Sequence, residues 1–323
     1  MTRLNEPVSV MPFNGPMQIN NLYARRRFLG LSASLVSGAL LSGCGGGGGG
    51  GSAAAEGGIT VVPGAVAEAP PPVVATPAPV AAHPLNLALN LAYLGAAFYG
   101  HAAQGAGLTA DLTAGIGQAG IATGARSALL SDPAIAEVAA ELATDKSAQV
   151  AALRNQIGAQ AAAQPAMDLS AQPGGAFSVA AQRAGIVPAG SSFDPYANDN
   201  QFLLGAFLIE DMVAATYRGL LMAGGEDASA LVTESLADAI YHGGLVRTLL
   251  EDRARSDTAL AATLGKATSF AMPDGSTADA QANILDSEGR VIPFTREAPQ
   301  VLDMLYLAGS AGGGFLPAGA NGV

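Results

Sequence analysis

One stretch of the sequence, residues 193–221, constrains the fold of this chain more than any other. It opens with a turn at Asp194-Pro195 and continues as a predicted helix over residues 197–222. The apolar residues of this helix have helical spacing, yet Glu210 lies in the middle of the stripe that they form. A carboxylate in that position faces other helices, and a buried charge must be paired or neutralised. The sequence therefore predicts a helical bundle with a polar site inside.

The composition agrees with a well-packed helical protein. Half of the 323 residues (50%) are apolar and only 13% are charged, which is enough apolar sequence for a sizeable core. The formal net charge of -11 argues against nucleic acid and anionic membrane surfaces as binding partners. Cys44 is the single cysteine, so no disulfide framework exists within one chain.

The N-terminal residues have the pattern of an export signal. Arg25-Arg26 begins a segment that resembles the twin-arginine motif, and a short apolar run follows it. Cys44 ends a segment that resembles a bacterial lipobox, in which the cysteine becomes the lipidated first residue. We therefore interpret residues 1–44 as a signal for twin-arginine export to the periplasm or cell envelope. Simple cleavage of the signal, without a lipid on Cys44, is the alternative.

The rest of the chain is expected to have three parts. Residues 45–83 are rich in Gly, Pro and Ala and cannot bury enough apolar surface to offset their ordering entropy, so we predict a flexible tether. The helical bundle is expected over residues 84–256. Residues 257–323 are predicted to form a C-terminal extension packed on the bundle. The expected partner is a membrane, to which the lipid on Cys44 would attach the protein. Association into a homo-oligomer is an open alternative.

The bundle is predicted to contain four long helices. Periodicity and helix-end signals place them at residues 85–103, 133–157, 197–222 and 228–253. The first of them is apolar nearly all round, which predicts a central position. The long connector over residues 160–192 allows a crossover between the second and third helices. Shorter features are predicted at 177–184 (helix), 286–290 (hairpin) and 298–308 (the one helix of the extension).

Two other long helices also carry polar side chains on their inner faces. Lys146 and Gln149 interrupt the apolar face of the second helix in its middle. His242 lies on the inner face of the fourth helix. These three side chains are therefore the ones expected to meet Glu210 inside the bundle.

Two segments carry a resemblance to a known family. FDPYAND at residues 193–199 and LLGAF at residues 203–207 resemble bacterial ferritin-like domain proteins related to plant desiccation proteins. The resemblance covers the chain from about residue 84 to the end. It implies an all-α, ferritin-like four-helix bundle with a C-terminal extension. It also implies a structural or stress-related (desiccation) role in the cell envelope.

The family resemblance also implies a metal centre, most of whose ligands this chain lacks. Ferritin-like folds build a di-iron site from one glutamate on each of two helices and a Glu-x-x-His on each of the other two. The positions that match those ligands here are Ala92, Gly95 or Ala97 in the first helix, Lys146 and Gln149 in the second, Glu210 in the third, and Ala239 and His242 in the fourth. Only Glu210 and His242 keep a ligand, and two ligands do not hold two metals against water.

We therefore expect a bundle without a cofactor, whose interior contains a hydrogen-bonded polar cluster of Lys146, Gln149, Glu210 and His242. The sequence shows no Gly-x-Ser-x-Gly element and no phosphate loop, so hydrolase chemistry has no support. With most of the metal ligands missing as well, the leading expectation is a role that is not enzymatic.

The alternative is a divergent metal-binding oxidase or metal-storage protein. It would hold iron or manganese with Glu210 and His242, and Asp238 and Asp145 are candidates for further ligands.

Overall fold

The computed structural model describes residues 83–224, 230–270, 296–307, 309 and 311–323. The predicted export signal, the predicted tether up to residue 82 and the predicted hairpin at 286–290 lie outside these residues. The helices are α2 (Asn86–Gln104), α3 (Ala110–Thr113), α4 (Pro133–Ile157), the 3-10 helix η1 (Gly158–Gln160), α5 (Ala176–Arg183), α6 (Asp199–Gly224), α7 (Ala230–Ala254), α8 (Thr258–Phe270) and α9 (Ala298–Tyr306). Two short strands, β1 (Ala122–Thr123) and β2 (Met167–Asp168), complete the described elements.

Helix α2 is the central helix, as its sequence predicts. Nearly all of its residues are buried, because apolar side chains lie on every side of it. It ends at Gly105, which has a left-handed backbone with φ of 73° and donates its N–H to the carbonyls of Gly100 and His101. A helix that is buried all round has no outer face, so other elements must cover each side.

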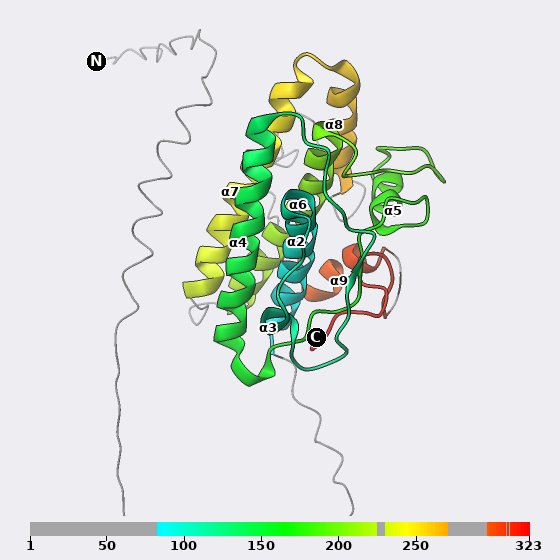
Figure 1. Ribbon diagram of the computed structural model, residues 1–323. Coiled ribbons are helices and arrows are strands. Elements are labelled where there is room, and N and C mark those ends of the chain that lie inside the picture. Colours follow the sequence, from blue (N-terminus) through cyan, green and yellow to red (C-terminus); the bar gives the residue numbers. More distant parts are fainter. Residues whose placement is uncertain (1–82, 225–229, 271–295, 308, 310) are drawn as a thin grey trace, which may run out of the picture. The chain divides into compact units, whose positions relative to one another are not determined.

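Helix α4 lies along α2 in the antiparallel direction (Figure 1). Asn86 at the start of α2 donates a hydrogen bond to Gln160 just after α4, and Gly95 in the middle of α2 faces Lys146 in the middle of α4. Helices α6 and α7 form the second extensively packed pair. The two pairs together make the four-helix bundle.

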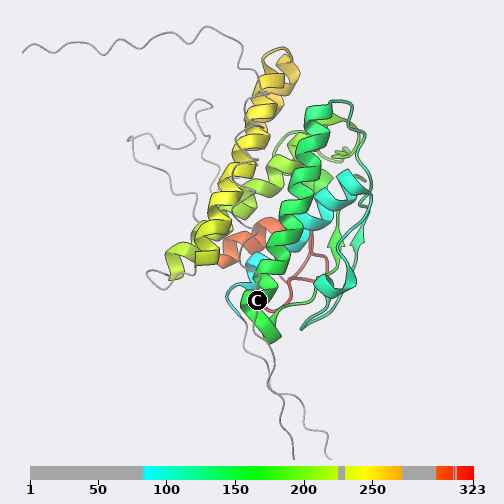
Figure 2. The same cartoon turned by 60° about the vertical axis from the view of Figure 1, so that its left-hand side comes forward.

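A crossover segment joins the two pairs. Helices α4 and α6 run parallel, because Asp199 at the start of α6 accepts hydrogen bonds from Ser131, just before α4, and Glu210 contacts Lys146 further along. Parallel neighbours cannot be joined by a short turn, so residues 158–198 return along the bundle. Strand β2 in this segment pairs in parallel with β1, and Figure 2 shows the two strands side by side.

The extension contains more helix than the sequence analysis predicted. Helix α9 packs on α6, and its apolar Val301 and Leu305 are buried. The prediction of a single helix in residues 257–323 is wrong, because α8 follows α7 almost directly and packs against α7 and α6. Leu260, Leu264 and Ala267 form its narrow buried stripe.

Residues near the C-terminal end close over the start of α2. Asn90, which is fully buried, donates from Nδ2 to the carbonyl of Asn321 at 2.8 Å and accepts from the Asn321 N–H at 3.0 Å. The Asn321 side chain donates to the carbonyls of Gln118 and Ala163 and accepts from the Gln118 N–H. Asn86 donates to the carbonyl of Gly322. This Asn321 clamp joins α2, the loop before α4 and the crossover.

Within the described residues, no helix is both long and apolar enough to span a membrane.

Candidate functional site

The bundle interior contains a buried ion pair. Lys146 on α4 donates from Nζ to Oε2 of Glu210 on α6 at 2.6 Å. Their side chains are 1% and 0% exposed, so neither charge contacts water. The contact expected between these two residues is therefore present. An isolated charge at this depth would be strongly unfavourable, so each group depends on the other.

Tyr99 on α2 completes the hydrogen bonding of Glu210. Its hydroxyl donates to the second carboxylate oxygen, Oε1, at 2.9 Å. Burial raises the pKa of Tyr99 well above 10.0, and the negative charge of Glu210 raises it further, so the phenol keeps its proton and acts as a donor. Both oxygens of Glu210 thus accept hydrogen bonds from protein groups. Sequence reasoning missed this role of Tyr99, although the residue lies four positions after Gly95 on α2.

Gly95 makes room for the lysine. A Cβ at position 95 would lie 3.3 Å from Cδ and 3.5 Å from Cγ of Lys146. The aliphatic part of Lys146 therefore runs across the glycine, and only a residue without a side chain avoids crowding it. Gly95 is also one of the three positions in the first helix where the family resemblance implies an acidic residue. The lysine side chain occupies the space that such a residue would need.

His242 and Gln149 do not join this network. His242 is buried on α7, as expected, but its Nε2 lies 3.0 Å from Oδ2 of Asp145 at the edge of α4. Its Nδ1 and Oε1 of Gln149 are buried without a hydrogen-bond partner among the described residues. Asp238 is exposed on the outer side of α7. The expected cluster of four residues is therefore reduced to the Lys146–Glu210 pair, with Tyr99 as its third member.

The residues at this site do not fit a two-metal centre. Both oxygens of Glu210 are hydrogen-bonded to protein donors, and one donor is an ammonium group that repels cations. In the part of the chain that the structure describes, no group of three or more His, Cys, Asp or Glu side chains is arranged to hold a metal ion. The donor set supplies hydrogen bonds and a positive charge where metal ligands are required.

A second acid, Asp211, follows Glu210 directly on α6. Asp211 on α6 is half-buried, and burial raises the pKa of its carboxyl from 3.8 to about 7, an effect that Arg247 and Arg296 only partly offset. A raised pKa means that the fold favours the protonated form. Its contribution to stability is therefore complete below about pH 4, decreases as the pH rises towards 7 and is lost above that.

Asp211→Asn is expected to stabilise the protein at pH 8. Full burial with a shift of this size corresponds to about 4 kcal/mol, and partial solvation reduces the expected gain to about 1–2 kcal/mol. The gain should shrink as the pH falls and vanish near pH 4. Urea unfolding at pH 8 and at pH 4.5 measures it, with Asp238→Asn as an exposed control. Equal effects of Asp211→Asn at the two pH values would contradict the prediction.

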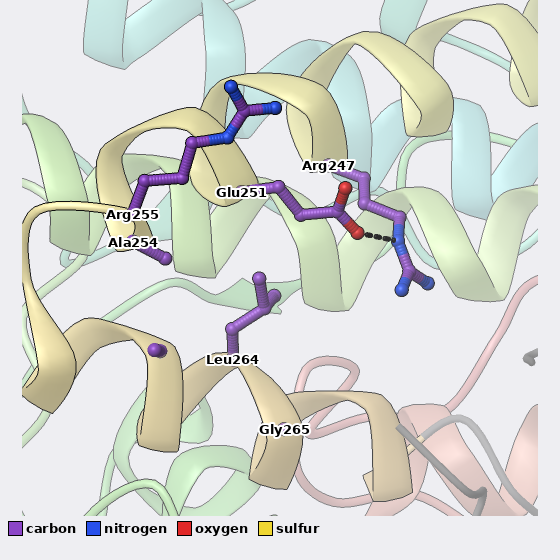
Figure 3. A pocket seen from close by; sticks show the side chains of 7 residues that line it. Arg247, Glu251, Ala254, Arg255, Leu264 and Gly265 are labelled. Atoms are coloured by element: carbon purple, nitrogen blue, oxygen red, sulfur yellow. Dashed lines mark hydrogen bonds and ion pairs between the residues drawn. The ribbon is translucent and has the colours of Figure 1, made fainter. Parts of the chain in front are cut away.

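A cavity between α7 and α8 is the other candidate site (Figure 3). Its volume is about 290 Å³, and Ala254, Leu264 and Gly265 form part of its lining. Arg247 donates from Nε to Oε1 of Glu251 at 2.7 Å across the cavity wall, and Arg255 adds a second positive charge to the lining. The lining includes no nucleophile and no acid–base pair aimed at a common point.

Comparison with known proteins gives one match. A family model described as a ferritin-like domain matches residues 81–252, a range that includes α2, α4, α6 and most of α7. No curated protein and no solved structure matches the chain significantly.

Proposed function

Because this chain belongs to the ferritin-like domain family, we propose that it is a family member whose interior ion pair has replaced the di-iron centre. The role that we propose is structural or stress-related, not enzymatic. We propose further that the protein is exported by the twin-arginine route and is held in the cell envelope by a lipid on Cys44. A desiccation-related role rests on the family resemblance of residues 193–207.

One observation carries this proposal, namely the position of Lys146. In the Glu-x-x-His pattern of ferritin-like bundles, residues 146 and 149 on α4 correspond to the glutamate and the histidine. The ammonium group of Lys146 lies 2.6 Å from Glu210, so it supplies positive charge where a metal would supply it. Tyr99 satisfies the remaining oxygen. The site is neutral and hydrogen-bonded as it stands, and a metal would have to displace the lysine.

Metal analysis tests this proposal. Protein purified through its own export pathway, incubated with Fe²⁺ or Mn²⁺ and desalted, is expected to contain far less than one metal ion per chain. A rebuilt variant should behave differently. It carries Gly95→Glu, Lys146→Glu, Gln149→His and Ala239→Glu, which together with Glu210 and His242 restore the full ligand pattern. We expect it to bind about two metal ions per chain.

The same rebuilt variant with Glu210→Gln added is the matched control, and it should bind substantially less metal. Stoichiometric iron or manganese in the wild-type protein would contradict the proposal and would favour a metal-binding oxidase or a metal-storage protein instead. Failure of the rebuilt variant to bind metal, while it remains folded, would show that α2, α4, α6 and α7 do not present the expected ligand positions.

A further inference from the structure

The Asn321 clamp contains a chemically labile dipeptide, Asn321-Gly322. The backbone nitrogen of the residue after an asparagine can attack the side-chain amide of that asparagine. A glycine in the second position leaves this nitrogen unhindered, because it has no Cβ. Asparagine is counted among the thermolabile residues of proteins. The bonds that join the start of α2 to the rest of the chain therefore depend on a side chain that can be altered covalently.

The fold requires the glycine of this dipeptide. Gly322 has a φ of 69°, in the left-handed region that glycine adopts without strain. A Cβ at position 322 would lie 2.5 Å from Nδ2 of Asn86. The Asn86 amide is held in place, since it donates to the carbonyls of Gln160 and Gly322 and accepts from the N–H of Ala162. A residue with a side chain does not fit here, so the fold keeps the glycine and the reactivity that comes with it.

The fold requires the asparagine as well. Nδ2 of Asn321 donates to the carbonyl of Gln118 at 2.8 Å and to that of Ala163 at 2.9 Å, and Oδ1 accepts from the N–H of Gln118 at 3.1 Å. These contacts use two donors and one acceptor of a single side chain, which an amide provides. An ionised carboxylate of the same size has no hydrogen to donate. Aspartate at position 321 would therefore lose both bonds to the carbonyl groups.

The closed clamp holds the reactive atoms of the dipeptide apart. Three hydrogen bonds fix the side-chain amide of Asn321 against two other segments, and two bonds with Asn90 fix its backbone. Attack requires Cγ of Asn321 to turn towards the nitrogen of Gly322, which breaks the three side-chain bonds. The reaction should therefore proceed from an opened clamp, as amide hydrogen exchange proceeds from locally opened states. Both residues are partly exposed, so water reaches them.

We propose that Asn321-Gly322 is a deamidation site and that its modification opens the clamp irreversibly. In the open clamp, the Gly322 nitrogen forms a bond to Cγ of Asn321. The Cγ–Nδ2 bond breaks, and ammonia leaves with the proton of the Gly322 N–H. Water then hydrolyses the cyclic imide to aspartate or isoaspartate at position 321. Nothing is oxidised or reduced, and the loss of ammonia makes the change irreversible.

The modified clamp cannot close again in its original form. Either product presents a carboxylate to the carbonyl oxygens of Gln118 and Ala163, which need donors. When the clamp is open, the buried amides of Asn86 and Asn90 lose their partners at residues 321 and 322. Unpaired buried polar groups are costly, so the start of α2 should open to water more often after the modification.

Peptide mapping by mass spectrometry, combined with detection of released ammonia, tests the reaction. In the full-length protein at pH 8, Asn321 should deamidate at least about tenfold more slowly when the chain is folded than when it is unfolded in urea. Asn90→Ala removes two bonds to the backbone of residue 321 and should accelerate the reaction in the folded protein about tenfold. Asn155→Ala, at an exposed position on α4, is the matched control and should leave the rate unchanged.

A second measurement needs no variant. Urea at concentrations that leave the helical circular dichroism spectrum unchanged should already accelerate deamidation of the wild type, because it favours local opening. Equal rates at Asn321 in the folded and the unfolded protein, or no reaction at Asn321 in the unfolded protein, would overturn the proposal.

Asn321→Asp tests the irreversible opening, because it reproduces one of the two products. Hydrogen exchange in residues 113–123 and 161–164 should be about tenfold faster in this variant than in the wild type, since two side-chain bonds are lost. Wild-type exchange rates in Asn321→Asp would show that the clamp closes with a carboxylate, and this result would refute irreversible opening.

Discussion

Lys146→Met is expected to lower the free energy of unfolding by about 3–5 kcal/mol. Methionine fills most of the space of the lysine stem against Gly95, so the loss comes from the charge. Glu210 would remain buried with one hydrogen bond, from Tyr99, and without an opposite charge. Urea unfolding at pH 7, followed by circular dichroism, measures the change.

The double variant Lys146→Met, Glu210→Leu separates the net contribution of the ion pair to stability from the cost of leaving one charge unpaired. An apolar replacement of both partners leaves no charge unpaired, so the double variant should be about as stable as the wild type. Lys266→Met, at an exposed lysine on α8, is the matched control and should change stability by no more than about 0.5 kcal/mol. A double variant that is clearly less stable than the wild type would show that the ion pair is net stabilising, contrary to this prediction.

Asn321→Ala is expected to lower the free energy of unfolding by about 2–3 kcal/mol. The substitution removes three side-chain hydrogen bonds of the Asn321 clamp, two to Gln118 and one to Ala163, each contributing about 1 kcal/mol. The backbone bonds between residue 321 and Asn90 remain available. Thermal unfolding measures the loss, and hydrogen exchange should show faster exchange in residues 113–123 and 161–164.

Asn155→Ala is the control for the clamp. Asn155 is exposed near the end of α4, so the same Asn→Ala substitution there removes no buried group. A change within about 0.5 kcal/mol is expected. If Asn321→Ala behaved like Asn155→Ala, the clamp would contribute nothing to stability.

The long helices and the ion pair could be predicted from the sequence because strong local signals mark them. Helix α4 has the predicted bounds, since Asp132 caps it by accepting from the N–H of Ala134 and Pro133 follows at the first position. Glu210 and Lys146 each interrupt an otherwise apolar stripe at helical spacing. The family model supports the ferritin-like assignment for residues 81–252.

What the sequence analysis missed depends on contacts between distant segments or on weak patterns. Helix α8 has only a narrow apolar stripe and contains an exposed glycine, Gly265, in its interior. Asp257, which accepts hydrogen bonds from the backbone N–H groups of Ala259 and Leu260, was a usable signal for its start. In the sequence, Tyr99 has the pattern of an ordinary core aromatic. Its role depends on its contact with Glu210 from another helix. The pairing of His242 with Asp145 depends on how α4 and α7 are rotated, which residue spacing along one helix does not determine.

The Asn321 clamp also has a consequence for the order in which the protein folds. Its bonds join residues 231 positions apart in the chain, Asn90 and Asn321. Contacts of such long sequence separation form late, because the whole intervening chain must be arranged first. During synthesis α2 emerges early. The buried side-chain amides of Asn86 and Asn90 can nevertheless not bond to the backbone of residues 321 and 322 until those residues have been made. The packing around α2 is therefore complete only after residues 321 and 322 have been made, and a nascent chain remains short of its native state until then.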